Sequence, residues 1–481
     1  MPGLTRRSFL KSTLAAAATV TLSGTKSSGR VLGANDSIRL GVAGLNGRGG
    51  DHIREFGRMP GVRIAYLIDP DAGQFARRLK LLEELKAPKA TTVLDIREAL
   101  ADKNLDAISI ATPNHWHALM TIWACQAGKD VYVEKPCSHN IHEGRVAVQA
   151  ARQHNRIVQH GTQRRAQKEW IDIAAAVKSG KYGKLLVSRG LVYKLRLPIG
   201  QKPTCEPPAE LDFDLWLGPA KEQPYHANLV HYNWHWFWDF GDGDIGNQGV
   251  HQMDVARWMI PCAKWPNQVV SLGGRFGYKD QGETPNTQIS FFDYGETKLI
   301  FEVRGLPTLK YPHTPDGSDN VLHLEAGTIA GFKFYPKGSE KGEPITDAKS
   351  NSESKSADNI FANFIAAVRS RKQADLCADI EEGHFSSALC HLANISYRLG
   401  DTKIDASRAE LANQNPDLAE AVDRTWKHLG SPAKLNGEDR SMRLGRFLTI
   451  DAKREAFVND SDADKLLTRV YRQPFVVPDK I

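Results

Sequence analysis

The fold is decided by residues 38–49, Ile-Arg-Leu-Gly-Val-Ala-Gly-Leu-Asn-Gly-Arg-Gly. The apolar pattern through Val42 predicts a short strand, and the glycines after it predict a tight turn that opens a helix running to Arg58. Gly44 and Gly49 occupy the outer positions of the pattern Gly-x-Gly-x-x-Gly. Such glycines let the main chain approach a pyrophosphate, and the helix N-terminus offers free N–H groups. The stretch therefore predicts a dinucleotide-binding turn.

The cofactor predicted for this turn is NAD. Asn46 stands in place of the middle glycine, and because Asn tolerates left-handed backbone geometry we expect the turn to form. Asp69 closes the next predicted strand, where a carboxylate can bind both ribose hydroxyls and would repel a 2′-phosphate. The alternative is a purely structural loop. The residues assigned to the cofactor from this region are Gly44, Asn46, Gly47, Arg48, Gly49 and Asp69.

Strand-like and helical segments alternate on either side of this turn, which indicates a parallel, doubly wound sheet. The predicted strands are 38–42, 62–68, 106–110, 130–133 and 157–159, with helices near 44–58, 71–86, 115–128 and 142–154. Beyond about residue 161 long strand candidates dominate, at 184–195, 268–276, 286–293, 297–303 and 320–326. They favour an open, mainly antiparallel sheet.

The fold class is therefore α/β: an N-terminal Rossmann domain followed by an α+β domain. We expect the Rossmann domain over 35–160, the second domain over 161–400, and a polar tail over 401–481 that wraps the surface. The 41% hydrophobic and 25% charged residues are those of an ordinary globular protein. The six cysteines are scattered without a C-x-x-C pair, so neither a disulfide framework nor a metal site is indicated.

The first 34 residues have the pattern of a secretory leader. Thr5-Arg6-Arg7-Ser8-Phe9-Leu10-Lys11 precedes a mildly apolar run, and the paired arginines predict a twin-arginine signal and a periplasmic or otherwise exported protein. The alternative is a disordered basic arm. Removing the five basic residues of 1–34 lowers the net charge from +7 to +2. No basic stripe then remains to suggest nucleic acid, and no membrane span is expected in the mature chain.

A second motif, Glu134-Lys135-Pro136, follows the apolar run 131–133. A lysine at a strand end, with a proline fixing the next turn, can reach into a nucleotide crevice and move a proton. Burial and a positively charged nicotinamide would both lower its pKa. The alternative is a surface lysine before a turn. We therefore expect Lys135 to be a catalytic residue.

Taken in order, five motifs resemble the glucose–fructose oxidoreductase / inositol dehydrogenase / MocA family. Besides the glycine turn and Glu134-Lys135-Pro136, they are Thr112-Pro113-Asn114-His115-Trp116-His117, Gly161-Thr162-Gln163-Arg164 and residues 246–254, Gly-Asn-Gln-Gly-Val-His-Gln-Met-Asp. The resemblance covers about residues 38–400, and the leader and tail look like the exported branch. It implies NAD(P)-linked chemistry on sugars or cyclitols and a second domain that often mediates oligomerisation. It extends the cofactor set to Thr112, Pro113, Asn114, His117, Glu134 and Lys135.

The resemblance also implies a second catalytic residue, His251, as acid/base or substrate ligand. His251, Asp254 and Trp258 fall on one helix face, although a structural histidine at a helix start remains the alternative. Inositol dehydrogenase-like members carry Asp four residues before this histidine, whereas this chain has Asn247, which cannot take a proton. The predicted substrate-binding residues are Gln163, Arg164, Trp234, Trp236, Asn247 and Asp254.

Residues 225–239 are the predicted specificity region. Five of the ten tryptophans lie between 216 and 258, and flat aromatic faces suit sugar rings. The alternative is an aromatic mini-core under a long loop. The histidines of this region match no standard metal-ligand spacing, so no metal is predicted.

These observations together predict an exported NAD-dependent oxidoreductase acting on a sugar or sugar derivative. Because no NAD pool exists outside the cytoplasm, we expect a tightly bound cofactor that is reduced and reoxidised within one cycle. One alternative is an NAD-dependent glycosidase that works by transient oxidation and elimination. A second is a non-catalytic sugar-binding protein. The expected partners are a small sugar and further copies of the chain, as a dimer or tetramer.

Overall fold

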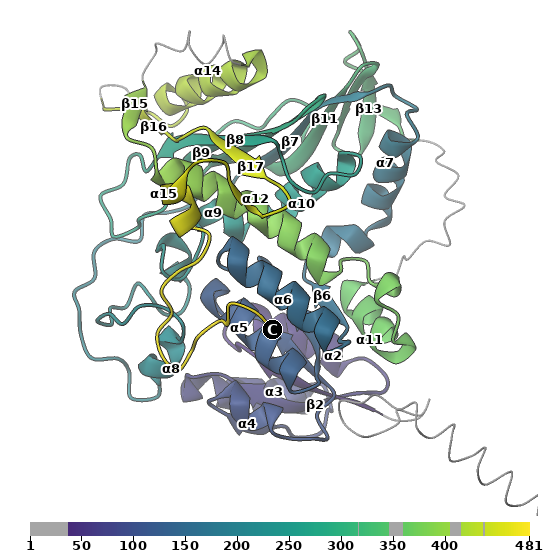
Figure 1. Cartoon of the computed structure of the whole chain (residues 1–481), viewed down its shortest axis with the longest axis vertical. Helices are drawn as coiled ribbons and strands as arrows, with labels where there is room; N and C mark the ends of the chain where they lie inside the picture. Colours follow the sequence, from purple (N-terminus) through teal and green to yellow (C-terminus); the bar gives the residue numbers. More distant parts are fainter. Residues whose placement is uncertain (1–36, 316, 346–358, 405–414, 436–437) are drawn as a thin grey trace, which may run out of the picture.

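The computed structural model describes residues 37–315, 317–345, 359–404, 415–435 and 438–481. The predicted leader, residues 1–34, lies outside these ranges. Two sheets are stacked along the longest axis of the molecule, with helices between them (Figure 1). Within the described ranges, no helix combines the length and the apolarity needed to cross a bilayer.

The first sheet is a six-stranded parallel Rossmann sheet in the order β3-β2-β1-β4-β5-β6. Every predicted strand of this domain is present, which confirms the predicted fold, and the short edge strand β3 is additional. Its strands are β1 (Ile38–Ala43), β2 (Val62–Ile68), β3 (Thr91–Val93), β4 (Ala107–Ile110), β5 (Asp130–Val133) and β6 (Val158–His160). The order reverses between β1 and β4, where open parallel sheets bind their ligands.

Helices cover both faces of this sheet. One face packs on α4 (Ile96–Leu100), α5 (Asn114–Gln126) and α6 (Ile141–Gln153). The other packs on α2 (Arg48–Gly57), α3 (Phe75–Glu84) and α11 (Ile360–Ser370). Phe361 of α11 stacks on Tyr132 of β5, with ring centroids 4.7 Å apart. A helix that follows the second sheet in the chain therefore completes the core of the first domain.

The second sheet is mixed and mostly antiparallel, in the order β14-β13-β12-β11-β7-β10-β9-β8-β16-β15. Only the pair β7–β10 is parallel among its described pairs. The predicted strands correspond to β7 (Leu185–Tyr193), β8 (Gln268–Gly274), β9 (Thr287–Tyr294), β10 (Thr297–Arg304) and β11 (Ser318–Leu324). Further strands are β12 (Gly327–Ala330), β13 (Lys333–Pro336), β14 (Glu343–Pro344), β15 (Thr402–Ile404), β16 (Met442–Leu444), β17 (Leu448–Asp451) and β18 (Ala456–Phe457).

Alternating side chains give this sheet two apolar faces. Val269 of β8 and Phe292 of β9 pack on the inner helices α10 (Gly249–Met259) and α12 (Ile380–Arg398). Val270 and Phe291, their chain neighbours, pack on α14 (Pro416–Gly430) on the outer face. Figure 1 shows α10 and α12 between the two sheets and α14 on the far side. The remaining helices are α7 (Lys168–Lys178), α8 (Phe213–Leu217), α9 (Gly243–Asn247) and α15 (Ser461–Lys465).

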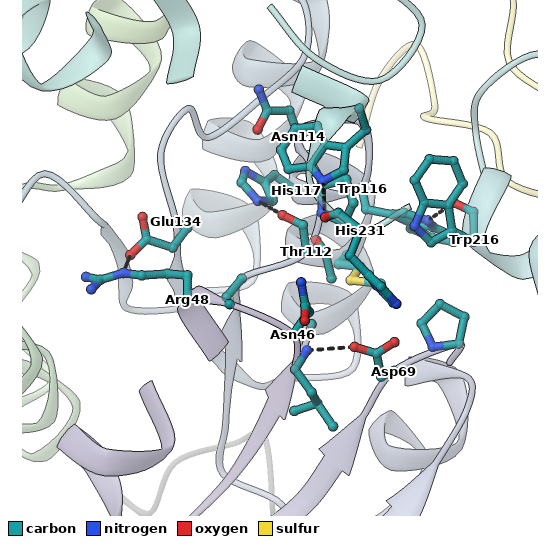
Figure 2. Close-up of a pocket in the computed structure, with 18 of the residues that line it drawn as sticks. Asn46, Arg48, Asp69, Thr112, Asn114, Trp116, His117, Glu134, Trp216 and His231 are labelled. Atoms are coloured by element: carbon teal, nitrogen blue, oxygen red, sulfur yellow. Dashed lines mark hydrogen bonds and ion pairs between the residues drawn. The ribbon is translucent and has the colours of Figure 1, made fainter. Parts of the chain in front are cut away.

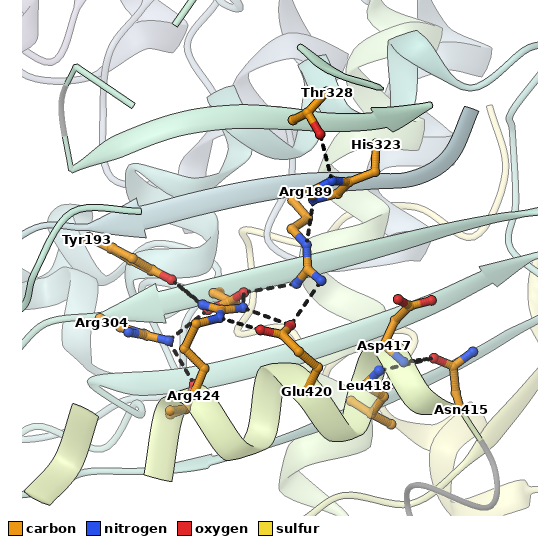
Figure 3. Close-up of polar contacts among 12 residues, drawn as sticks. Arg189, Tyr193, Arg304, His323, Thr328, Asn415, Asp417, Leu418, Glu420 and Arg424 are labelled. Atoms are coloured by element: carbon orange, nitrogen blue, oxygen red, sulfur yellow. Dashed lines mark hydrogen bonds and ion pairs between the residues drawn. The ribbon is translucent and has the colours of Figure 1, made fainter. Parts of the chain in front are cut away.

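A buried charge network fixes α14 to the outer face (Figure 3). Glu302 of β10 is fully buried and pairs with Arg189, Arg304 and Arg424, the last from α14. The Tyr193 hydroxyl donates to the same carboxylate at 2.7 Å. Burial alone would raise the pKa of Glu302, but Arg424 and the other two arginines lower it to about 2. The tail therefore contributes a structural helix as well as surface segments.

Residues 205–240, named here the cover segment, leave the second domain and lie against the Rossmann domain. Main-chain bonds join it to the loop after β2, from Ala72 N to the Glu210 oxygen and from Asp212 N to the Pro70 oxygen, each 2.9 Å. The end of the tail packs on the cover segment, where Arg472 Nε donates to the Gly218 oxygen at 3.0 Å. The tail thus connects both domains to this segment.

Candidate active site

The glycine turn between β1 and α2 is shaped for close approach of a ligand. Gly44 has a φ of +82°, and a Cβ there would lie 2.6 Å from the main chain of Ala111. A Cβ at Gly49 would lie 1.8 Å from the Gly44 oxygen. Asn46 and Gly47 do not have positive φ, so the left-handed geometry expected for Asn46 is wrong and Gly44 alone supplies it. Helix α2 has no side-chain cap, which leaves its first N–H groups available to an anion.

A cavity of about 260 Å³ opens beside this turn. The predicted residues that line it are Gly44, Asn46, Gly47, Arg48, Asp69, Thr112, Pro113, Asn114, His117, Glu134, Lys135, Trp234 and Asn247. Figure 2 shows Arg48 and Glu134 on one side of the cavity and Asp69 and Trp216 on the other. Together with the turn, these residues fit a dinucleotide.

Asp69 lies at the end of β2, where the ribose partner was predicted. One carboxylate oxygen accepts from Leu45 N at 2.6 Å and the other from Asp71 N at 2.9 Å. Burial raises the pKa of Asp69 to about 6, although both main-chain bonds oppose the shift. The carboxylate therefore remains mainly ionised at neutral pH and is held at the cavity wall.

The ends of β4 and β5 are tied together by His117. Its ring nitrogens lie 2.5 Å from the Pro136 oxygen and 2.8 Å from the Thr112 oxygen. Asn114 begins α5, and its side-chain Nδ2 donates to the buried Asp242 at 3.1 Å. This bond uses one of the two N–H groups of the Asn114 amide. This contact joins a cofactor residue to the second domain.

Glu134 is the polar centre of the site. Its Oε1 accepts from Arg48 Nε at 2.8 Å, from the His52 ring at 3.1 Å and from Gln163 Nε2 at 3.3 Å. Burial alone would raise the pKa of Glu134, but the His52 bond and the Arg48 charge hold it well below its usual range. Glu134 is therefore a carboxylate with several donors, and it organises the residues beside Lys135.

Lys135 extends from the end of β5 toward the second domain. Its Nζ donates to the main-chain oxygen of Asn247 at 2.9 Å. Burial lowers the pKa of Lys135, and the neighbouring Glu134 opposes this. The contact uses the backbone of residue 247, so it does not depend on whether Asn or Asp stands there. This geometry allows Lys135 to share a proton at the boundary between the domains.

His251 lies near the start of α10 and is partly exposed. Burial and then the Lys135 charge hold its pKa well below the usual range, so the imidazole is neutral at physiological pH. Asp254, predicted on the same helix face, is fully buried and is bound to Arg165 and Ser386. It is not among the residues that line the cavity, and its carboxylate holds Arg165.

The other predicted substrate residues divide between two places. Gln163 and Arg164 lie in a 3₁₀ turn (Gln163–Ala166) that contacts Glu134 and α10, and both are partly exposed. Trp234 lines the cavity and stacks on His235, with centroids 3.6 Å apart. Trp236 lies under Arg196 outside this cavity. Trp234 also belongs to a buried aromatic cluster of the cover segment. It therefore lines the cavity, as predicted for a specificity residue, and also packs in an aromatic mini-core, as the alternative predicted.

Sequence reasoning missed several residues of the site, because they come from segments without regular structure or from elements far apart in the chain. His52 supports Glu134 from inside α2, and Arg196 forms a two-bond pair with Asp244 at 2.6 and 2.8 Å. From the cover segment, Trp216, His231, Tyr232 and His235 line the cavity. The last three lie in the predicted specificity region 225–239, although none of them was predicted individually. The described residues include no group of three or more His, Cys, Asp or Glu that could hold a metal ion.

The fold and the turn define an NAD-binding α/β protein with a second, sheet-containing domain. Residues 38–162 match the model of the oxidoreductase family with an NAD-binding Rossmann fold, GFO_IDH_MocA. Residues 187–272 match the model of the family's C-terminal alpha/beta domain. These two segments are similar to the two domains of the Gfo/Idh/MocA oxidoreductase family, and the first of them matches its NAD-binding Rossmann domain.

Curated relatives match about a third of the chain. An inositol 2-dehydrogenase of Corynebacterium glutamicum (strain R) is 32% identical over 157 residues, 32% of this chain and 45% of that protein. Glycosyl hydrolase family 109 protein 2 of Shewanella sp. (strain ANA-3) is 32% identical over 163 residues, 30% of this chain and 36% of that protein. The chain thus spans less than half the length of these two relatives.

Solved structures share the fold across both domains. The WlbA dehydrogenase of Bordetella pertussis, in complex with NADH and UDP-GlcNAcA, aligns with a TM-score of 0.55 at 18% identity, covering 75% of this chain and 97% of that one. GenD2 from gentamicin A biosynthesis, in complex with NAD, aligns with a TM-score of 0.51 at 16% identity, covering 76% and 95%.

Proposed function

We propose that this protein is an exported NAD-dependent oxidoreductase that acts on a ring hydroxyl of a sugar or sugar derivative. The observation that carries the proposal is the position of Lys135. It contacts the second domain through Asn247, lines the cofactor cavity, and is close enough to His251 to lower the pKa of that histidine. A hydroxyl placed between Lys135 and His251 would meet two groups able to move its proton.

The roles of the residues follow from their protonation states. NAD, when bound, supplies a hydride acceptor for the carbon that bears the hydroxyl. His251, being neutral, accepts the hydroxyl proton as the carbonyl forms, and Lys135 donates a hydrogen bond to the same oxygen. Glu134 holds Arg48 and Gln163 in place around this oxygen. In the reverse direction His251 returns the proton.

The cover segment supports a cofactor that stays bound. His231 faces Asp71 at 2.9 Å, and the Trp216 oxygen accepts from Trp116 Nε1 at 3.0 Å, so the segment is joined to the Rossmann domain on both sides of the cavity. Release of NAD would require these contacts to open. A retained cofactor suits a redox-neutral reaction, such as transfer between two sugars or an epimerisation.

A second candidate is glycoside cleavage by transient oxidation. It is favoured by the relative named as a family 109 glycosyl hydrolase and by the presence of two proton-moving groups beside the cavity. Oxidation of a ring hydroxyl acidifies the neighbouring C–H, one base removes that proton, and the aglycone leaves by elimination. Water then adds and the hydride returns. A nitrophenyl glycoside that releases nitrophenol without added oxidant would favour this reading over net oxidation.

Export and self-association are further parts of the proposal. The paired Arg6 and Arg7 support a twin-arginine route, and an Arg6→Lys/Arg7→Lys double variant retained in the cytoplasm would bear this out. Equal export of the variant would exclude it.

A dimer or tetramer would associate through the β11–β14 side of the second sheet, because α14 covers the outer face over β8–β10. Light scattering of the purified protein measures the assembly, and a monomer would exclude it.

The activity itself is tested with the purified holoprotein and a panel of sugars, inositols and glycosides. Absorbance at the NADH band follows half-reactions, and product analysis follows redox-neutral turnover. Loss of both in a Lys135→Ala variant that still holds NAD would support the proposal. Sugar binding that Lys135→Ala retains in full, in a protein that shows neither reaction, would instead support a non-catalytic sugar-binding protein.

A further inference from the structure

Arg164 is a partly exposed cation beside the catalytic residues that has no acidic partner at contact distance. Its guanidinium donates to Asn320 Oδ1 at 3.0 Å, and Gln252, with its amide turned so that both ends are satisfied, accepts from it at 2.9 Å. In the described part of the chain, no carboxylate lies within 4.0 Å of it. The charges of Asp319 and Asp254 raise its pKa, against the larger effect of burial.

The next residue, Arg165, is an arginine whose charge is balanced by carboxylates. Arg165 is buried and binds Asp254 at 2.8 Å and Glu382 at 3.1 Å. Burial alone would lower its pKa, but these two carboxylates raise it. Burial lowers the pKa of Arg164, and the charges of Asp319 and Asp254 offset this only in part. A half-buried guanidinium held only by neutral amides is costly, and an anion supplied from outside would remove that cost.

Among the charged groups that act on His251, positive charges outnumber negative ones. After burial, the charges that shift the pKa of His251 are Lys135, Arg164 and Arg48, and Glu134 is the opposing acid. Glu134 is already bound to Arg48, His52 and Gln163. Lys135 and Arg164 are therefore the two cations near His251 that no carboxylate binds, and both are left for an acidic ligand.

We infer that the substrate is an acidic sugar whose carboxylate binds Arg164 while its reacting hydroxyl lies at Lys135 and His251. The inference rests on the proposed function and names the substrate class of that site. A planar guanidinium with free N–H groups matches a carboxylate, and Trp170, whose ring lies 5.5 Å from the Arg164 guanidinium, fixes its plane. Uronic acids, aldonic acids and their glycosides have this chemistry.

The test compares acids with their neutral counterparts on NAD-loaded protein. Isothermal titration calorimetry measures binding of D-glucuronate, D-galacturonate and D-gluconate beside D-glucose and D-galactose at low salt. We expect at least one acid to bind about tenfold more tightly than the neutral sugars, the usual scale for a charge-assisted bond. We also expect added salt to weaken that binding.

Three variants separate the site from general charge effects. Arg164→Gln, which can still bond to Asn320, should abolish the preference for acids, and Arg164→Lys, which keeps the charge without the fork, should retain part of it. Arg63→Gln removes one exposed charge from β2 and should change nothing. Circular dichroism and melting temperature check that each variant is folded.

The outcomes distinguish this inference from the proposed function. Equal or tighter binding of neutral sugars, no measurable binding of any acid, or a preference that persists in Arg164→Gln would overturn the acidic-sugar inference. Reduction of bound NAD by neutral sugars alone would overturn it and leave the oxidoreductase proposal intact. Acids that bind through Arg164 without any redox or cleavage reaction would support the carboxylate site and contradict the proposed function.

Discussion

The ammonium group of Lys135 donates to the main-chain oxygen of Asn247, 112 residues away, at 2.9 Å. This bond joins the Rossmann sheet to the helical layer of the second domain at the cofactor cavity. Because the contact to Lys135 comes from the backbone, it does not depend on the side chain at position 247.

Introducing an acid at position 247 should change the pH profile and leave the architecture unchanged. In Asn247→Asp a carboxylate lies beside Lys135 and His251 and favours their charged forms, so both pKa values rise. Activity should then be lost at a higher pH on the acid side than in the wild type. Rate against pH, measured with one substrate for both proteins, checks this. An acid limb that stays in place or moves to lower pH would contradict the assignment.

Removing the lysine charge should have two separable effects. Lys135→Gln should lower the rate by about 100-fold or more, the usual contribution of a positioned proton-transfer group. The pKa of His251 should rise because the cation that depresses it is gone. On acidification, the residual activity should therefore be lost at a higher pH than in the wild type. Lys168→Gln, an exposed change on α7, is the charge-matched control. A rate decrease without any shift of the pH profile would show that Lys135 lies too far from His251 to influence its pKa.

Loosening the cover segment should speed release of the cofactor. Arg472→Ala removes the bond to Gly218 and the ion pair with Asp214. Losing about two such bonds corresponds to roughly tenfold faster release. Transfer of NADH from the protein to an excess of a second dehydrogenase measures the rate. Lys465→Ala, in the same tail but paired with Asp462, should not change it. Unchanged release in Arg472→Ala would mean that the tail does not hold the cover segment.

The Glu302 network predicts a stability effect with a defined pH window. The folded pKa of about 2 lies below the value of about 4.3 for an unpaired glutamate. Its stabilisation is therefore complete above the unfolded value and is lost as the pH falls toward 2. Glu302→Gln should cost about 3–5 kcal/mol at neutral pH, since it leaves clustered buried arginines.

Urea unfolding of both proteins across this pH range measures the Glu302 effect. Glu296→Gln, which breaks an exposed pair with Lys184, should cost less than about 1 kcal/mol. A Glu302→Gln protein as stable as the Glu296→Gln control would show that α14 does not depend on the network.

Local patterns predicted most of the fold and the cofactor half of the site. Strand, turn and helix signals around Gly44 and Asp69 depend on neighbours in the chain, and the structure has each element where it was expected. The five central strands of the second sheet followed from their length and apolar content in the same way. Short strands such as β3 and β14 have too few residues to show a period.

The substrate half depended on contacts that no local pattern encodes. Asp254 had helix spacing in its favour, yet Arg165 from another segment occupies it. Trp234 and Trp236 look alike in the sequence, and only the path of the cover segment places one in the cavity and the other outside it. His52 lies within an ordinary amphipathic helix, and its partner Glu134 is 82 residues away. Such long-range pairings are set by tertiary packing.

The central claim is that NAD stays bound to the chain through the catalytic cycle, and its most direct test is the cofactor content of the mature protein. Protein purified without added nicotinamide is denatured, and the released NAD(H) is quantified by enzymatic cycling. We expect about one NAD(H) per chain, in keeping with a cavity that is lined by both the glycine turn and the cover segment. Protein that emerges empty and binds added NAD reversibly would contradict retention and indicate an ordinary dehydrogenase. Empty protein that fails to bind NAD would contradict the enzymatic account as a whole.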